Sequence, residues 1–195
     1  MNRKILLVLS LLLGLFAVSL AQDVDPEMAK QSADIVTRMR KVELLNQILP
    51  IALTKDQIQQ ILPVLERIRD KNRKLLEQEH KDLLEFDRSS SDALDAALKG
   101  EMPKQDYVRN MEAFYKANDI RRQVAMGENL DILMPKLKEI CNQGQMKVMA
   151  NSLTLAFFEP DLTAGDVNDE VKERVFAREV LLDPLTYDLL VQMSK

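Results

Sequence analysis

Residues 53–76, LTKDQIQQILPVLERIRDKNRKLL, contain a complete helix start signal followed by a long amphipathic run. Thr54 is placed to accept a hydrogen bond from a backbone N–H of the first turn, and the Gln57 side chain is placed to reach back to the backbone of Thr54. Leu53 and Ile58 occupy the two positions of a hydrophobic staple. Apolar side chains then recur every three or four residues as far as Phe86, so the sequence predicts a long helix that begins at this cap.

A second start signal of the same type lies at residues 141–146, CNQGQM. Asn142 can cap a helix, Gln145 stands three residues later, and the residues at the two staple positions are again apolar or sulfur-containing. The stretch LMPKL at 133–137 is a weaker candidate for the same repeat, because Met134 cannot cap. The chain therefore contains a degenerate internal repeat of one helix cap.

Further helices are predicted on either side of these caps. Asp25-Pro26-Glu27 combines a capping side chain, a proline at the first helical position and an acid in the first turn, so a helix should run from there to about Pro50. The run Ser89-Ser90-Ser91-Asp92 should break the long helix and cap a short one that ends at Gly100. Another long helix should start at Pro103. The sequence thus predicts an all-α fold in which two long antiparallel helices form a hairpin with flanking helices.

The last part of the chain differs in charge from the rest. Residues 159–195 carry nine acidic and four basic residues, with a helical pattern over 171–182 and a short helix that starts after Pro184. We predict that they form an acidic helical C-terminal extension of a central helical domain, residues 22–158.

The first 21 residues have the features of an export signal. Arg3 and Lys4 precede an apolar run, and Ser19 and Ala21 are small residues at the two positions that define a cleavage site. The alternative is an uncleaved anchor, because the run is near the lower limit of ~17 residues for a spanning helix. The small residues favour cleavage of residues 1–21, which predicts a periplasmic protein without a membrane span after signal cleavage.

Charge and cysteine content exclude several classes of protein. The formal net charge is −4 and no segment is strongly basic, so a nucleic-acid partner is not expected. The single cysteine, Cys141, cannot form an internal disulfide. A free buried thiol is our first interpretation of Cys141, and an intermolecular disulfide or a reactive site is the second.

The sequence offers few groups for catalysis or metal binding. It has one histidine, one cysteine and no glycine-rich phosphate loop, which predicts a non-enzymatic protein without a cofactor. His80 and Glu77 lie one helical turn apart, but two ligands on a charged helix face are more typical of solvated surface, and no metal site is predicted. The pair Arg121-Arg122, in a polar stretch of a long helix, is a possible binding site for acidic partners.

The motif Leu53-Thr54-x-x-Gln57, placed after an export signal and followed by a second cap at Asn142 and Gln145, resembles the LTxxQ motif of the Spy/CpxP family of envelope proteins. The resemblance covers roughly residues 26–158. It implies a small periplasmic helical protein, a curved homodimer, that acts as an ATP-independent chaperone or as a modulator of envelope stress; related members bind metal ions. The second cap departs from the motif, because Cys141 and Asn142 stand where the family has Leu and Thr.

Three functions follow as expectations from these residues and this resemblance. The first is a chaperone-like or envelope-stress protein that binds unfolded or envelope proteins through an apolar surface, in which Thr54, Gln57, Asn142 and Gln145 are structural. The second is an envelope adaptor whose C-terminal extension binds one specific partner. The third is a metal-responsive sensor or scavenger built on the same fold.

Overall fold

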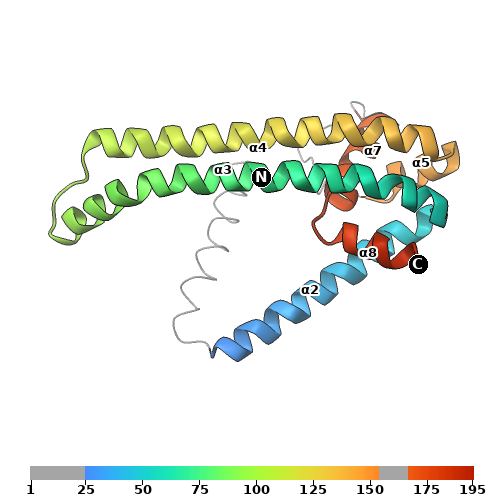
Figure 1. Cartoon of the computed structure of the whole chain (residues 1–195), viewed down its shortest axis with the longest axis horizontal. Coiled ribbons are helices and arrows are strands. Elements are labelled where there is room, and N and C mark those ends of the chain that lie inside the picture. Colours follow the sequence, from blue (N-terminus) through green and yellow to red (C-terminus); the bar gives the residue numbers. More distant parts are fainter. Residues whose placement is uncertain (1–24, 154–166) are drawn as a thin grey trace. The chain divides into compact units, whose positions relative to one another are not determined.

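The computed structural model describes residues 25–153 and 167–195, and within them all regular structure is helical (Figure 1). The all-α prediction is therefore confirmed. In chain order the elements are α2 (Pro26–Ile48), the 3-10 turn η1 (Leu49–Ile51), α3 (Lys55–Leu98), α4 (Gln105–Ile140), α5 (Gln143–Asn151), α7 (Asp169–Phe176), the π-helical segment η2 (Ala177–Leu181) and α8 (Thr186–Met193).

Two predicted features lie outside the described residues. One is the signal peptide at 1–21, and the other is the domain division at residue 159. Among the helices that are described, none is both long enough and apolar enough to cross a membrane.

The chain divides into two compact units, one ending at Leu45 and the other running from Asn46 to Lys195. The described part of the first unit is α2 as far as Leu45. Five apolar side chains of this helix are exposed, with accessibilities of 50–67%: Met28, Ile35, Val36, Met39 and Val42.

Helix α3 is longer than the sequence indicated. The predicted break at residues 89–92 is wrong, because α3 continues without interruption to Leu98, and the predicted short helix is its last part. Serine has only a moderate helix penalty, and the Ser89 hydroxyl donates to the Phe86 carbonyl 2.9 Å away instead of capping a new helix. Helix α4 starts at Gln105, two residues later than predicted.

Helices α3 and α4 lie side by side and run in opposite directions (Figure 1). Residues near the start of α3 contact residues near the end of α4, and residues near the end of α3 contact the start of α4. The Gln57 amide donates to the Ile140 carbonyl at 2.7 Å, whereas the Tyr107 hydroxyl donates to Ser90 at 3.2 Å. The two helices thus stay paired along most of their length.

The apolar core of the second unit gathers at one end of this helix pair. There α5 packs against α7, α8 packs against α3, and η2 packs against α4. The side chains that these contacts bury to 2% accessibility or less include Ile58, Ile61, Leu65, Ile68, Leu133, Leu137, Met149, Phe176, Val180, Leu181 and Leu190. We call this end of the α3/α4 pair the base, and the end at the connector between the two helices the tip. The C-terminal helices therefore supply a large share of the core at the base.

Candidate functional site

The motif at residues 53–57 forms the N-terminal cap of α3. The Gln57 backbone N–H donates to Thr54 Oγ1 at 3.2 Å, and the Thr54 backbone N–H donates to Gln57 Oε1 at 2.9 Å. Leu53 is half-buried beside the cap, and Ile58 is buried in the base core. The side chains of Thr54 and Gln57 thus satisfy two of the backbone donors that a helix start leaves unpaired.

The second cap has the same geometry at the start of α5. The Gln145 backbone N–H donates to Asn142 Oδ1 at 2.9 Å, and the Asn142 backbone N–H donates to Gln145 Oε1 at 3.0 Å. Gly144 lies inside this first turn, and a Cβ at that position would stand 3.2 Å from Asn142 Oδ1. Glycine therefore leaves room for the capping amide.

The tertiary structure joins the two caps through their glutamines. Gln57 Nε2 donates to Gln145 Oε1 at 2.9 Å, and Gln145 Nε2 donates to Gln57 Oε1 at 3.0 Å. Each amide also donates to a carbonyl two residues before the other cap, Gln57 to Ile140 at 2.7 Å and Gln145 to Ala52 at 3.2 Å. We call this arrangement the glutamine clamp. It ties the start of α3 to the turn between α4 and α5, so its role is structural.

A polar layer crosses the α3/α4 pair farther toward the tip. Arg122 donates to both carboxylate oxygens of Glu79 at 2.7 Å, and Arg121 donates to Asp82 at 2.6 Å. The Glu79 side chain is 5% accessible, whereas that of Arg122 is 64% accessible. The two arginines that the sequence suggested as a partner-binding site are therefore already paired within the chain, and only Arg122 also presents a large exposed surface.

The acidic partners of these arginines, Glu79 and Asp82, could have been identified from their spacing along α3. Leu75, Glu79, Asp82 and Phe86 follow one another at four- and three-residue steps, so the two acids stand in the stripe that faces α4. A charged residue at such a position is expected to find an opposite charge on the facing helix.

Glu79 gives the protein a testable pH dependence. The hydrogen bonds from Arg122 hold the pKa of Glu79 below its ordinary value of 4.5. The folded state therefore binds this proton less readily than the unfolded state, so the stabilisation is complete above the unfolded-state pKa and is lost as pH falls through the lower, folded-state pKa. We expect the difference in free energy of unfolding between wild type and Glu79→Gln, measured by urea titration at pH 7 and at steps down to pH 3, to shrink with falling pH. A constant difference would show that the ion pair does not stabilise the fold.

The distal part of the α3/α4 pair exposes an apolar surface. Five of its side chains are between 37% and 64% accessible: Leu76, Leu83 and Leu94 of α3, and Val108 and Tyr115 of α4. Leu83, Val108 and Tyr115 each directly follow a residue that contacts the other helix: Asp82, Tyr107 and Phe114. Leu76 and Leu94 stand 7 and 11 residues from Leu83 and therefore share its face of α3. Because the helices run in opposite directions, residues that follow inward positions point to the same side of the pair. We call this surface the apolar flank.

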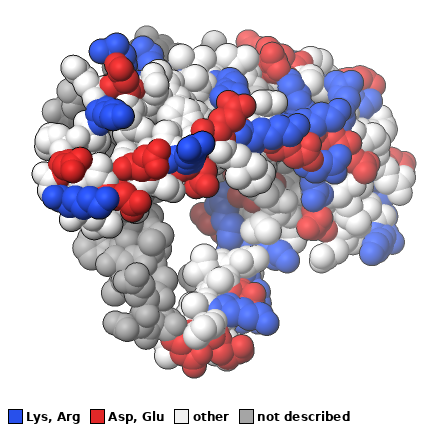
Figure 2. Space-filling view, turned by 60° about the vertical axis from the view of Figure 1, so that its left-hand side comes forward, with Lys and Arg blue, Asp and Glu red and all other residues white. Residues whose placement is uncertain are grey.

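The rest of the distal surface has mixed charge. In Figure 2 lysine and arginine side chains are interspersed with acidic and uncharged ones over the face in view, and neither sign covers it. The i,i+3 pairs Arg73–Asp70 and Arg109–Asp106 are examples of this local compensation.

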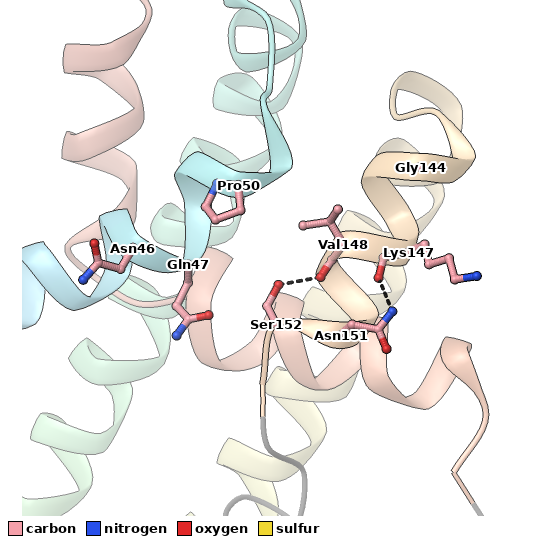
Figure 3. Close-up of a pocket in the computed structure, with 8 residues that line it drawn as sticks. All are labelled: Asn46, Gln47, Pro50, Gly144, Lys147, Val148, Asn151 and Ser152. Atoms are coloured by element: carbon pink, nitrogen blue, oxygen red, sulfur yellow. Dashed lines mark hydrogen bonds between the residues drawn. The ribbon is translucent and has the colours of Figure 1, made fainter.

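A hollow of about 610 Å³ opens between the end of α2, the turn η1 and α5. Its lining is mostly amide and apolar, and Figure 3 shows that Lys147 points away from Gln47 and Pro50. The side chains of Asn151 and Ser152 donate to the carbonyls of Lys147 and Val148, at 2.8 Å and 2.5 Å, and so are already satisfied by their own helix. These lining residues offer no nucleophile paired with a base.

Cys141 lines a second cavity, of about 360 Å³, with Met146 and Glu173. The thiol is buried and free, and burial raises the pKa of Cys141 to about 11. At neutral pH the thiol is therefore protonated and a poor nucleophile. Within residues 25–153 and 167–195 no three His, Cys, Asp or Glu side chains gather closely enough to hold a metal ion, and His80 is exposed.

A third cavity, of about 260 Å³, lies between α3, η2 and α8 at the base end of the apolar flank. Leu65, Ile68 and Leu181 form buried parts of its wall, and Leu76, which is 59% accessible, connects it to the apolar flank. Nothing in the sequence pattern marked this cavity, because it depends on where α8 packs.

The chain matches no known family model, no curated protein and no solved structure.

Proposed function

We propose that this protein is a non-enzymatic periplasmic helical protein of the Spy/CpxP type that binds apolar segments of unfolded or envelope proteins along the apolar flank. In this proposal α3 and α4 are the long hairpin of that family, the glutamine clamp is the form its repeated cap takes here, and the protein acts without ATP as a homodimer.

The apolar flank carries the proposal. Leu76 and Leu94 are 18 residues apart, so the apolar side chains follow α3 for about 27 Å at 1.5 Å per residue. Single exposed apolar residues are normal on a protein surface, but an aligned set on two adjacent helices offers a binding segment several contacts at once. Burial of one leucine side chain contributes about 1.5–3 kcal/mol, so a few such contacts suffice for weak, reversible binding.

The general form of the proposal predicts suppression of aggregation. The mature protein at a one- to fivefold molar ratio should suppress light scattering by an unrelated, chemically denatured protein without ATP. The double variant Leu76→Gln/Leu83→Gln should lose most of this effect. Leu84→Gln is the matched control, because Leu84 is 60% accessible but lies on the outer side of α3. Absence of suppression at fivefold excess would remove the general chaperone from consideration.

The cavity at the base end of the apolar flank supports a second candidate, an adaptor for one specific partner. Small-molecule sites typically enclose ~300–1,000 Å³, so a cavity of about 260 Å³ suits one large side chain better than a cofactor. A pocket that takes one side chain is the usual anchor of a specific protein interface. An adaptor would bind its partner selectively and leave the aggregation of unrelated proteins unchanged.

A further inference from the structure

We infer that the apolar flank recognises an amphipathic helix whose largest apolar side chain enters the cavity between α3 and α8 and which carries a carboxylate about one turn from that anchor. The inference rests on the proposed function and deepens it, because it names the kind of segment that is bound and the end of the flank at which it is held.

One helix of the protein itself, α8, already packs on this side of α3. Arg69, Leu76 and Leu83 recur at seven-residue steps on one face of α3, and α8 packs over the first part of that face. Arg69 there stacks on the Tyr187 ring, 4.2 Å from its centroid, and pairs with Asp188 at 3.4 Å. The apolar flank continues the same face of α3 toward the tip, next to the start of α8. A bound helix would therefore extend an intramolecular helix–helix interface with contacts of the same kind.

The cavity provides the anchor position. Its wall is mostly apolar, formed by buried side chains of α3 and η2 and by the ring of Tyr187. An amphipathic helix that lies along the apolar flank places one side chain every three or four residues toward α3, as in other helix-in-groove complexes. The side chain at the base end of such a helix would fill the cavity, and the following ones would contact Leu76 and Leu83.

Charge at this end of the apolar flank favours an acidic segment. Arg73 lines the cavity, three residues before Leu76, and its side chain is 66% accessible. Arg122 stands at the level of Glu79, between Leu76 and Leu83 along the pair, and uses only part of its guanidinium for Glu79. Two exposed arginines near the anchor thus offer hydrogen bonds to a carboxylate of the bound helix.

The acids close to this end are already engaged by other groups. Asp183 lines the cavity, and its Oδ1 accepts from the backbone N–H two residues later at 2.9 Å. Asp188 pairs with Arg69, and Arg73 pairs with two exposed acids, Asp70 at 3.0 Å and Glu77 at 3.9 Å. A carboxylate of the bound helix would exchange for these solvent-exposed contacts, which costs little because exposed ion pairs of this type are weak.

Two labelled helical peptides test the inference by fluorescence anisotropy. Both carry leucines at i, i+3, i+4 and i+7 spacing, and they differ only in having glutamate or lysine on the polar face. We expect the glutamate peptide to bind about threefold to tenfold more tightly at low salt. Leu83→Gln should weaken that binding about tenfold, and Arg73→Glu should weaken it about threefold to tenfold. Leu84→Gln and Lys74→Glu are the matched controls and should leave binding unchanged.

The chain contains no tryptophan, so Tyr187→Trp places a single reporter in the cavity wall. The emission of this introduced indole should shift on binding of the glutamate peptide and should not shift with a peptide in which the anchor leucine is alanine. Equal binding of the two charged peptides, an effect of Leu84→Gln as large as that of Leu83→Gln, or no response of the reporter would overturn the inference. If the protein suppresses aggregation but one of these three results is obtained, the proposed function stands and the inference about the bound helix fails. If the protein binds the glutamate peptide selectively but does not suppress aggregation, the inference is supported and the general chaperone is ruled out.

Discussion

Removal of residues 167–195 is expected to abolish the cooperative thermal unfolding of the protein. Helices α7 and α8 and the segment η2 cover α5, α3 and α4, and without them buried residues such as Ile61, Leu65 and Ile68 would meet solvent. The hydrophobic free energy lost with so many apolar contacts exceeds the ~5–15 kcal/mol by which a typical domain is stable. Circular dichroism of the truncated chain should show reduced helix content and no sharp transition.

A single substitution tests the same point with less disruption. Phe176 is fully buried, so Phe176→Ala should lower the free energy of unfolding by about 3–5 kcal/mol. Leu98→Ala is the control, because Leu98 is 78% accessible and its truncation should change stability by about 0.5 kcal/mol or less. The sequence-based interpretation of 159–195 as a separate extension predicts the opposite, a core that stays folded after truncation. An unchanged melting transition would support that interpretation.

The second large effect is expected at the glutamine clamp. Gln145 is 8% accessible, and its amide makes hydrogen bonds to the Asn142 N–H, the Ala52 carbonyl and Gln57. Gln145→Ala would remove the hydrogen bonds to the Asn142 N–H, the Ala52 carbonyl and the half-buried Gln57 amide. Each such bond contributes about 0.5–1.5 kcal/mol, so we expect a loss of about 2–4 kcal/mol in the free energy of unfolding. Urea titration measures it, and Gln143→Ala, an exposed change in the same turn, is the control.

Two further variants separate the cap from the clamp. Gln145→Glu keeps an acceptor for the Asn142 N–H but cannot donate to Gln57 or to Ala52, so a large loss in this variant identifies the contribution of the cross-connection. Thr54→Ala removes only one capping bond and should cost about 1 kcal/mol. If Gln145→Glu is as stable as the wild type, the two caps act independently and the clamp contributes nothing.

Local signals of the chain were sufficient for the helix starts. Thr54 with Gln57 and Asn142 with Gln145 could be identified from sequence because a capping box joins residues only three apart. The serine run at 89–91 misled the interpretation for the same reason, since a local capping preference was given more weight than the packing of α3 against α4. Packing at long range decides whether such a preference is used.

Residue types and spacing, by themselves, determined that the described residues are all-α and where α2, α3 and α5 begin. Only the tertiary structure decided that Gln57 meets Gln145, that Arg122 meets Glu79 and that α8 leaves a cavity next to Leu76. The physical reason is distance along the chain. Caps and amphipathic periods are set by neighbours within two turns, whereas these contacts join residues 43 to more than 100 positions apart, whose meeting depends on how whole helices pack.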